Sequence, residues 1–109
     1  MAKYEEYGYD IQNGKAIIPE WETEIKDEAF KYCKELKSVV IPQWVKKIGK
    51  GAFYECRNLE SVVLPEWMEE IGWSAFYSCS SLTTVKVSKD TMICGEVFKD
   101  CPNVTIEYY

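Results

Sequence analysis

Cysteine is the residue type with the greatest capacity for chemistry in this sequence. The chain has five cysteines and no histidine. Nucleophilic catalysis by a Cys–His pair is therefore excluded. Four of the cysteines are spaced by 23, 23 and 22 residues: Cys33, Cys56, Cys79 and Cys101. A disulfide framework has no reason to follow a constant period, so this spacing indicates a repeated structural unit.

Three interpretations of this cysteine column are open: buried core thiols, one disulfide between neighbours, or a metal site. A tetrahedral zinc site needs four sulfurs that converge on one ion. One cysteine per repeat would spread the outer two over about 14 Å, because neighbouring strands lie about 4.8 Å apart. We therefore expect core thiols, with no metal and no cofactor. Cys94 lies outside the column and is expected to be the most reactive thiol.

Tryptophan forms a second column, because Trp21, Trp44 and Trp67 each stand two residues after a proline. The simpler interpretation is that these rings stack on one another and on the prolines, as aromatic rings do in cores. The alternative is a partly exposed aromatic ladder that binds a protein or stacks on a sugar. The acidic cluster from residue 22 to residue 28 has no partner acid or base, which indicates a solvated surface rather than an enzyme.

The elements that must position these columns follow a block of about 23 residues. Alternation in Leu36-x-x-Val39-x-Ile41 predicts a short strand, which is repeated from Leu59 and from Leu82. The apolar spacing between Ile48 and Cys56 predicts one or two turns of helix, partly 3₁₀. Each coil should therefore run strand, turn, short helix, turn, and the stacked strands should form a parallel sheet.

The two ends of the chain depart from the repeat. Asn13-Gly14 between two alternating runs predicts a β-hairpin, whose second strand begins the parallel sheet. We expect a single domain over residues 1–109, with a hairpin cap at 1–17, three clear repeats at 18–87 and a degraded terminal repeat at 88–109. Residues 105–109 should form a last, exposed edge strand, through which two copies could pair.

The strand pattern also predicts which side chains face outward. If Val39, Val62 and Val85 face the core, the residues that follow them line the concave face of the sheet. An exposed apolar stripe often marks an interface, although a small cap could equally cover it. Together with the tryptophans, these positions form the predicted protein-binding site: Ile17, Trp21, Val40, Trp44, Val63, Trp67 and Lys86.

The pattern Ile-Pro-x-x-Val-x-x-Ile-Gly-x-x-Ala-Phe-x-x-Cys-x-x-Leu-x-x-Val closely resembles the BspA-like leucine-rich repeat, and it covers roughly residues 16–106. The resemblance implies a short α/β solenoid of about four coils with its parallel sheet on the concave face. Known members are mostly surface-exposed or secreted proteins of bacteria and protists that serve in adhesion and protein binding. The family implies no catalytic residues.

Composition limits the classes of partner. The formal net charge of −5 disfavours nucleic acid, and no apolar stretch is long enough for a membrane span. We expect a non-enzymatic protein-binding module, cytoplasmic because no signal peptide is visible, or at the cell surface if the chain has been trimmed. The alternatives are a carbohydrate-binding adhesin fragment, a self-assembling structural unit that forms a homodimer, and a small acidic inhibitor from a mobile-element system.

Overall fold

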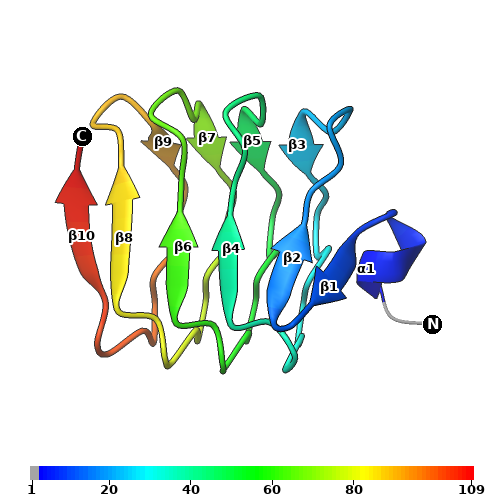
Figure 1. The fold of residues 1–109 in the computed structure, drawn as a ribbon. Helices are drawn as coiled ribbons and strands as arrows, with labels where there is room; N and C mark the ends of the chain where they lie inside the picture. Colours follow the sequence, from blue (N-terminus) through cyan, green and yellow to red (C-terminus); the bar gives the residue numbers. More distant parts are fainter. Residues whose placement is uncertain (1–2) are drawn as a thin grey trace.

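The structure is a computed structural model that describes residues 3–109. Stacked coils each contribute one strand to a front sheet and one shorter strand to a sheet behind it (Figure 1). The molecule measures 35 × 28 × 22 Å, and its long dimension runs along the stack (Figure 1). The predicted leucine-rich-repeat solenoid of about four coils, with its parallel sheet and hairpin, is confirmed.

The front sheet has six strands in the order β1-β2-β4-β6-β8-β10. Its strands are β1 (Asp10–Gln12), β2 (Lys15–Ile17), β4 (Ser38–Val40), β6 (Ser61–Val63), β8 (Thr84–Val87) and β10 (Thr105–Tyr108). Only the β1–β2 pair is antiparallel. Val39, Val62 and Val85 lie side by side in register and are buried. Residues that are 23 positions apart in the sequence are therefore paired in the sheet, so that each side chain lies beside the equivalent side chain of the next repeat.

The second sheet has four parallel strands of two residues each. Its strands are β3 (Glu24–Ile25), β5 (Lys47–Ile48), β7 (Glu70–Ile71) and β9 (Met92–Ile93). In each of the first three, a charged residue faces solvent or is half-buried, and an isoleucine is buried. The burial of these isoleucines closes the core opposite the front sheet.

The prediction of a short helix in each coil is wrong. The segments after the second-sheet strands form turns, and among residues 3–109 the helix is α1 (Lys3–Glu6). Two positions in each turn have positive φ angles. At the first position the residues are Glu28 (59°), Gly51 (61°), Ser74 (55°) and Glu96 (60°). At the second position they are Tyr32 (63°), Glu55 (54°), Ser78 (56°) and Asp100 (60°). A left-handed residue cannot continue a right-handed helix.

The backbone hydrogen bonds explain why these turns are stable. In the central coil, the Ala52 and Tyr54 N–H groups donate within the turn, to carbonyls three residues earlier. The alternate N–H groups of Phe53 and Glu55 donate to carbonyls of the next coil, at 2.7 Å each. Every second N–H thus joins two coils, which satisfies the backbone without any helix.

A continuous stack of phenylalanine rings forms the centre of the core. Phe30, Phe53, Phe76 and Phe98 lie with ring centroids 5.2, 5.0 and 5.7 Å apart and planes within 8° of parallel. Such pairs contribute about 0.5–1.5 kcal/mol each beyond the burial of their surface. The Phe column therefore holds the coils in register from the inside, as the sheets do from the outside.

The cysteine column lies beside this stack, and all five cysteines are free thiols. The Sγ atoms of Cys56, Cys79 and Cys101 donate to the carbonyls of Phe30, Phe53 and Phe76, at 3.0, 3.1 and 3.0 Å. Each thiol is therefore a second donor to a carbonyl of the preceding coil, which also accepts a backbone N–H. The interpretation as core thiols is confirmed, and the disulfide alternative is wrong.

The N-terminal segment covers the first coil. Asn13 and Gly14 have φ angles of 52° and 80°, as a type I′ hairpin turn requires, and the predicted hairpin is confirmed. Tyr9 is buried, stacks on Phe30 at 5.1 Å, and its hydroxyl donates to the Glu24 carbonyl. Residues 1 and 2 of the predicted cap lie outside the described residues.

Candidate functional site: the concave face and its tryptophan edge

An apolar stripe crosses the outward face of the front sheet, which the sequence predicts to be the concave face. Ile17, Val40 and Val63 follow the buried residue of successive strands, and their exposed fractions are 48%, 63% and 51%. Val40 and Val63 are paired in register, so their side chains are neighbours. The solvated face of a β-sheet normally carries polar side chains. Three β-branched side chains in a row on such a face are therefore unusual. We call Ile17, Val40 and Val63 the valine stripe.

The tryptophans at the ends of these strands are exposed. Trp21, Trp44 and Trp67 have exposed fractions of 79%, 42% and 63%. Ring-to-ring contacts in residues 3–109 involve Tyr and Phe, and none involves a tryptophan. The interpretation that these rings stack on one another is therefore wrong. We call the three residues the tryptophan edge.

Two hollows lie along the stripe, and one of them joins it to Trp67 of the tryptophan edge. One, of about 400 Å³, is lined by the whole valine stripe together with polar residues of the same strands, Lys15, Ser38 and Ser61. The other, of about 300 Å³, is lined by Val40, Val63 and Trp67 and by the prolines at the strand ends, Pro42 and Pro65. The structure thus brings Ile17, Val40, Val63 and Trp67 together. Trp21 and Trp44 do not line either hollow.

Lys86 continues the row beyond Val63, with which it is paired in register. Its Nζ atom lies 4.7 Å from the centre of the Tyr109 ring, within the range of a cation–π interaction. The Tyr109 hydroxyl donates to the Leu64 carbonyl, and its ring lines the smaller hollow. Tyr109 therefore belongs to this surface, although the sequence indicated it only as part of an edge strand.

Trp73 is a fourth exposed tryptophan, which no column of the sequence indicated. It lies beside the second sheet, in a hollow of about 260 Å³ shared with Glu24, Asp27 and Cys94. A Cβ atom on Gly95 would stand 2.2 Å from the Trp73 ring, so the ring lies directly against this glycine. Trp73 is thus held by the last coil and is distinct from the tryptophan edge.

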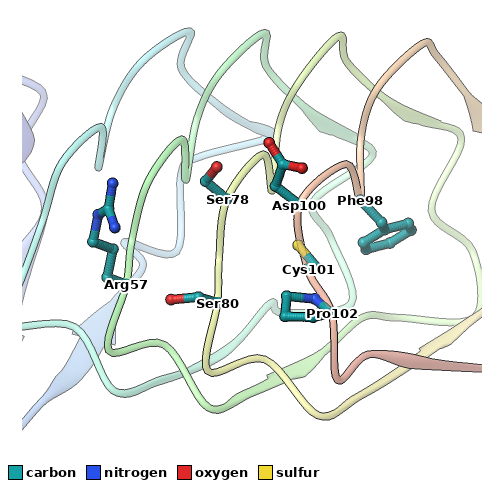
Figure 2. Close-up of a pocket in the computed structure, with 7 residues that line it drawn as sticks. All are labelled: Arg57, Ser78, Ser80, Phe98, Asp100, Cys101 and Pro102. Carbon is teal, nitrogen blue, oxygen red and sulfur yellow. The ribbon is translucent and has the colours of Figure 1, made fainter.

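A further hollow, of about 540 Å³, lies on the turn side of the last coils. Figure 2 shows Arg57 and Phe98 at its opposite ends, with Cys101 between them. The guanidinium of Arg57 is paired with Glu55 at 2.6 Å, and the Cys101 thiol is bonded to the Phe76 carbonyl. The Arg57 guanidinium and the Cys101 thiol of this hollow therefore already have partners within the fold.

Burial also lowers the reactivity of two thiols elsewhere in the core. Burial raises the pKa of the Cys33 thiol to about 12 and raises the pKa of the Cys56 thiol as well. Within residues 3–109, no group of three or more His, Cys, Asp or Glu residues is placed to hold a metal ion. No helix in this part of the chain has the length and hydropathy to cross a membrane.

A solenoid of stacked, equivalent coils, with equivalent strands paired in register, is the architecture of repeat proteins. The chain belongs to the BspA-type leucine-rich repeat family, whose repeat matches in six copies over residues 7–108. No curated protein sequence matches it.

Three solved structures share the fold. A leucine-rich repeat protein from Bacteroides ovatus is 20% identical in sequence and has a TM-score of 0.66. The match covers 92% of this chain and 35% of the Bacteroides ovatus chain. A leucine rich cell surface protein from Faecalibacterium prausnitzii is 25% identical, with a TM-score of 0.62 over 89% and 32%. The T. pallidum leucine rich repeat protein is 22% identical, with a TM-score of 0.61 over 90% and 66%. This chain thus spans about a third of the first two.

Membership of this family indicates a general class of function. Leucine-rich repeats of this type are generally non-enzymatic modules that serve in protein binding or adhesion.

Proposed function

We propose that this chain is a non-enzymatic protein-binding module that acts through the valine stripe and the adjacent tryptophan edge. One observation carries the proposal: among the described residues, the valine stripe and the tryptophan edge are repeat columns of the front-sheet side whose apolar side chains are exposed. The Phe, Cys, Ala and Leu columns are buried in the core and explain the fold. The stripe and the edge are not needed to close that core.

The exposed surface is large enough to contribute to binding. Full burial of a Val or Ile side chain contributes about 1.5–3 kcal/mol, and these three are about half exposed. Covering the stripe would therefore contribute about 3 kcal/mol before the costs of association. The tryptophans add large, rigid rings of the type that dominates binding hot spots. An extended peptide that lies across the strands would contact both.

A selection from a displayed library of random peptides would test this proposal. Peptides that are enriched on the immobilised chain should bind the Val40→Glu and Trp44→Ala variants of the chain about tenfold more weakly, or worse, than the wild type. The matched control is Trp73→Ala, because Trp73 is at least as exposed as Trp44 but lies beside the second sheet. Enriched peptides that bind both variants normally and fail to bind the control would overturn the proposed face.

A second candidate is carbohydrate binding, which is favoured by the exposure of the tryptophan edge alone. Indole rings offer flat apolar faces on which sugars stack, and such stacking would not need the valine stripe. A glycan array would separate the two candidates: saturable sugar binding that is lost in Trp44→Ala but kept in Val40→Glu would replace the protein-binding proposal with this one.

A further inference from the structure

Trp67 lines two hollows of different chemical character. The mostly apolar hollow that it shares with the valine stripe extends to Pro42 and Gln43 of the preceding turn. Another hollow, also of about 300 Å³, extends from Trp67 to Ser88 and Asp90 of the following turn. The Trp67 side chain is 63% exposed. A ligand that covers this ring can therefore enter both hollows.

Carboxylates dominate the hollow on the side of the following turn. Among the described residues that line it, three are acidic and none is a lysine or an arginine. The acidic residues are Glu66, Glu69 and Asp90, and all three are exposed. The ion pairs within residues 3–109 do not include any of them. We call this the acidic hollow.

This acidity is specific to Trp67 within the tryptophan edge. The two glutamates flank Trp67 in the sequence, whereas the equivalent positions around Trp44 are Gln43 and Lys46. Asp90 stands 23 residues after Trp67, where the repeat would place a further tryptophan. A carboxylate instead of an indole ring therefore lines the hollow beside Trp67.

Two lysines of the same coil lie outside the acidic hollow. The Nζ atom of Lys86 is 4.7 Å from the centre of the Tyr109 ring, and Lys86 does not line the hollow. Lys89 precedes Asp90 in the sequence but does not line the hollow either, and it forms no ion pair with Asp90. The negative charge beside Trp67 is therefore left for a ligand to neutralise.

We propose that the acidic hollow binds an arginine side chain of the partner peptide, while an apolar side chain of the same peptide enters the hollow on the other side of Trp67. A guanidinium near the face of an indole ring is attracted by the ring quadrupole, and its planar shape lets it stack there. Carboxylates accept paired hydrogen bonds from the same group. The assignment rests on the proposed function, because it names the chemistry of the partner at the same face.

The charge of the whole chain supports this assignment. A net charge of −5 attracts a basic peptide over a longer range than any one contact. Complementary charge contributes mainly to specificity and to the rate of association, whereas covered apolar surface contributes to affinity. The valine stripe would thus hold the peptide, and the acidic hollow would select which apolar peptides bind.

Peptides selected on the chain from a random displayed library are the probe for this contact. Those that bind the wild type and lose affinity for Val40→Glu should be enriched in arginine. Citrulline has nearly the shape of arginine but carries no charge. Replacing the arginine with citrulline should therefore weaken binding to the wild type about tenfold or more, as measured by isothermal titration calorimetry.

A neutral variant of the acidic hollow tests the same contact from the side of the protein. The combined changes Glu66→Gln, Glu69→Gln and Asp90→Asn should weaken the arginine peptide about tenfold and leave the citrulline peptide nearly unchanged. The matched control removes three carboxylates from the hollow beside the second sheet, through Glu24→Gln, Asp27→Asn and Glu70→Gln. It changes the net charge equally and should weaken binding by no more than about twofold. Circular dichroism establishes that each variant is folded.

Three results would overturn the assignment while the proposed function stands. One is a set of selected peptides that need Val40 but are not enriched in arginine. Another is an arginine peptide that the neutral variant binds as tightly as the wild type does. The third is an equal loss in the neutral variant and in its control, since binding would then respond to net charge and not to this hollow. Selected peptides that bind Val40→Glu and Trp44→Ala normally would instead overturn the proposed function, and the assignment with it.

Discussion

At the scale of single residues, the cysteine column is a set of hydrogen-bond donors rather than a reactive cluster. Each inner thiol bonds to a phenylalanine carbonyl of the preceding coil, which also accepts the backbone N–H of that coil's own cysteine. The thiol therefore uses the second lone pair of a buried carbonyl, and such a bond contributes about 0.5–1.5 kcal/mol. The constant spacing of the cysteines in the sequence thus places one thiol donor at the same backbone position of each coil.

This account predicts different effects for two substitutions of Cys79. Cys79→Ala removes the donor and leaves a small cavity, so it should lower the free energy of unfolding by about 1–3 kcal/mol. Cys79→Ser keeps a donor close to the Phe53 carbonyl and should cost less. Urea denaturation followed by circular dichroism would measure both. Equal losses in the two variants would mean that the hydrogen bond contributes nothing to stability.

The buried thiols also predict a loss of stability at alkaline pH. The pKa of Cys33 is raised from an ordinary value of 9.0 to about 12, mainly by burial. The folded state therefore holds the thiol proton more tightly than the unfolded state. Its contribution to stability is complete below about pH 9 and is lost as the pH rises toward 12.

Denaturation at a series of pH values tests this effect. The free energy of unfolding of the wild type should fall across this window, and Cys33→Ser, whose hydroxyl does not titrate there, should fall less steeply. Parallel curves for the two proteins would rule out the thiol as a cause.

At the scale of elements, the strands could be predicted from the sequence and the turns could not. The alternation around Val39, Val62 and Val85 specified both the strands and their register. In the turns, the left-handed positions are occupied mainly by residues such as Tyr32, Glu55 and Ser78 and seldom by glycine. No glycine pattern therefore marked them, and the apolar spacing resembled that of a helix.

The left-handed turns can be tested at Ser78, whose φ angle is 56°. Glycine adopts this conformation without the steric cost that other residues incur, so Ser78→Gly should stabilise the protein by up to about 1 kcal/mol. Ser78→Val should destabilise it by at least as much, because a β-branched residue tolerates positive φ poorly. Thermal melts of the pair would show the order. A valine variant as stable as the glycine variant would contradict the turn geometry.

The candidate site likewise has a part that could be predicted from the sequence and a part that could not. The column spacing placed the valine stripe on the outward face, because β-strand alternation leaves no other choice. It placed the tryptophans at the strand ends but did not give the directions of their rings, which depend on the turns after the prolines. Tyr109 was not indicated as a site residue because its position over Lys86 depends on the pairing of β10 with β8 and on the hydrogen bond to the Leu64 carbonyl.

At the scale of the whole molecule, stability depends on covering the first coil. The Tyr9 ring is buried against Phe30, and its hydroxyl also accepts the Lys26 N–H. Tyr9→Ala should therefore lower the free energy of unfolding by about 3–5 kcal/mol, as for other buried aromatic residues. Tyr7 precedes the same hairpin but is more than a third exposed, so Tyr7→Ala is the matched control and should cost much less. Equal losses would show that Tyr9 has no special role in the cap.

The central claim is that the valine stripe and the tryptophan edge form one binding face. The four indole N–H signals of the chain report on it directly, because three belong to the tryptophan edge and the fourth, Trp73, lies beside the second sheet. In a ¹H–¹⁵N NMR titration with a peptide selected on the chain, the signals of Trp21, Trp44 and Trp67 and the amides of the valine stripe should shift in a saturable manner, while Trp73 stays unchanged. Saturable binding that shifts Trp73 and leaves the tryptophan edge unmoved would contradict the claim.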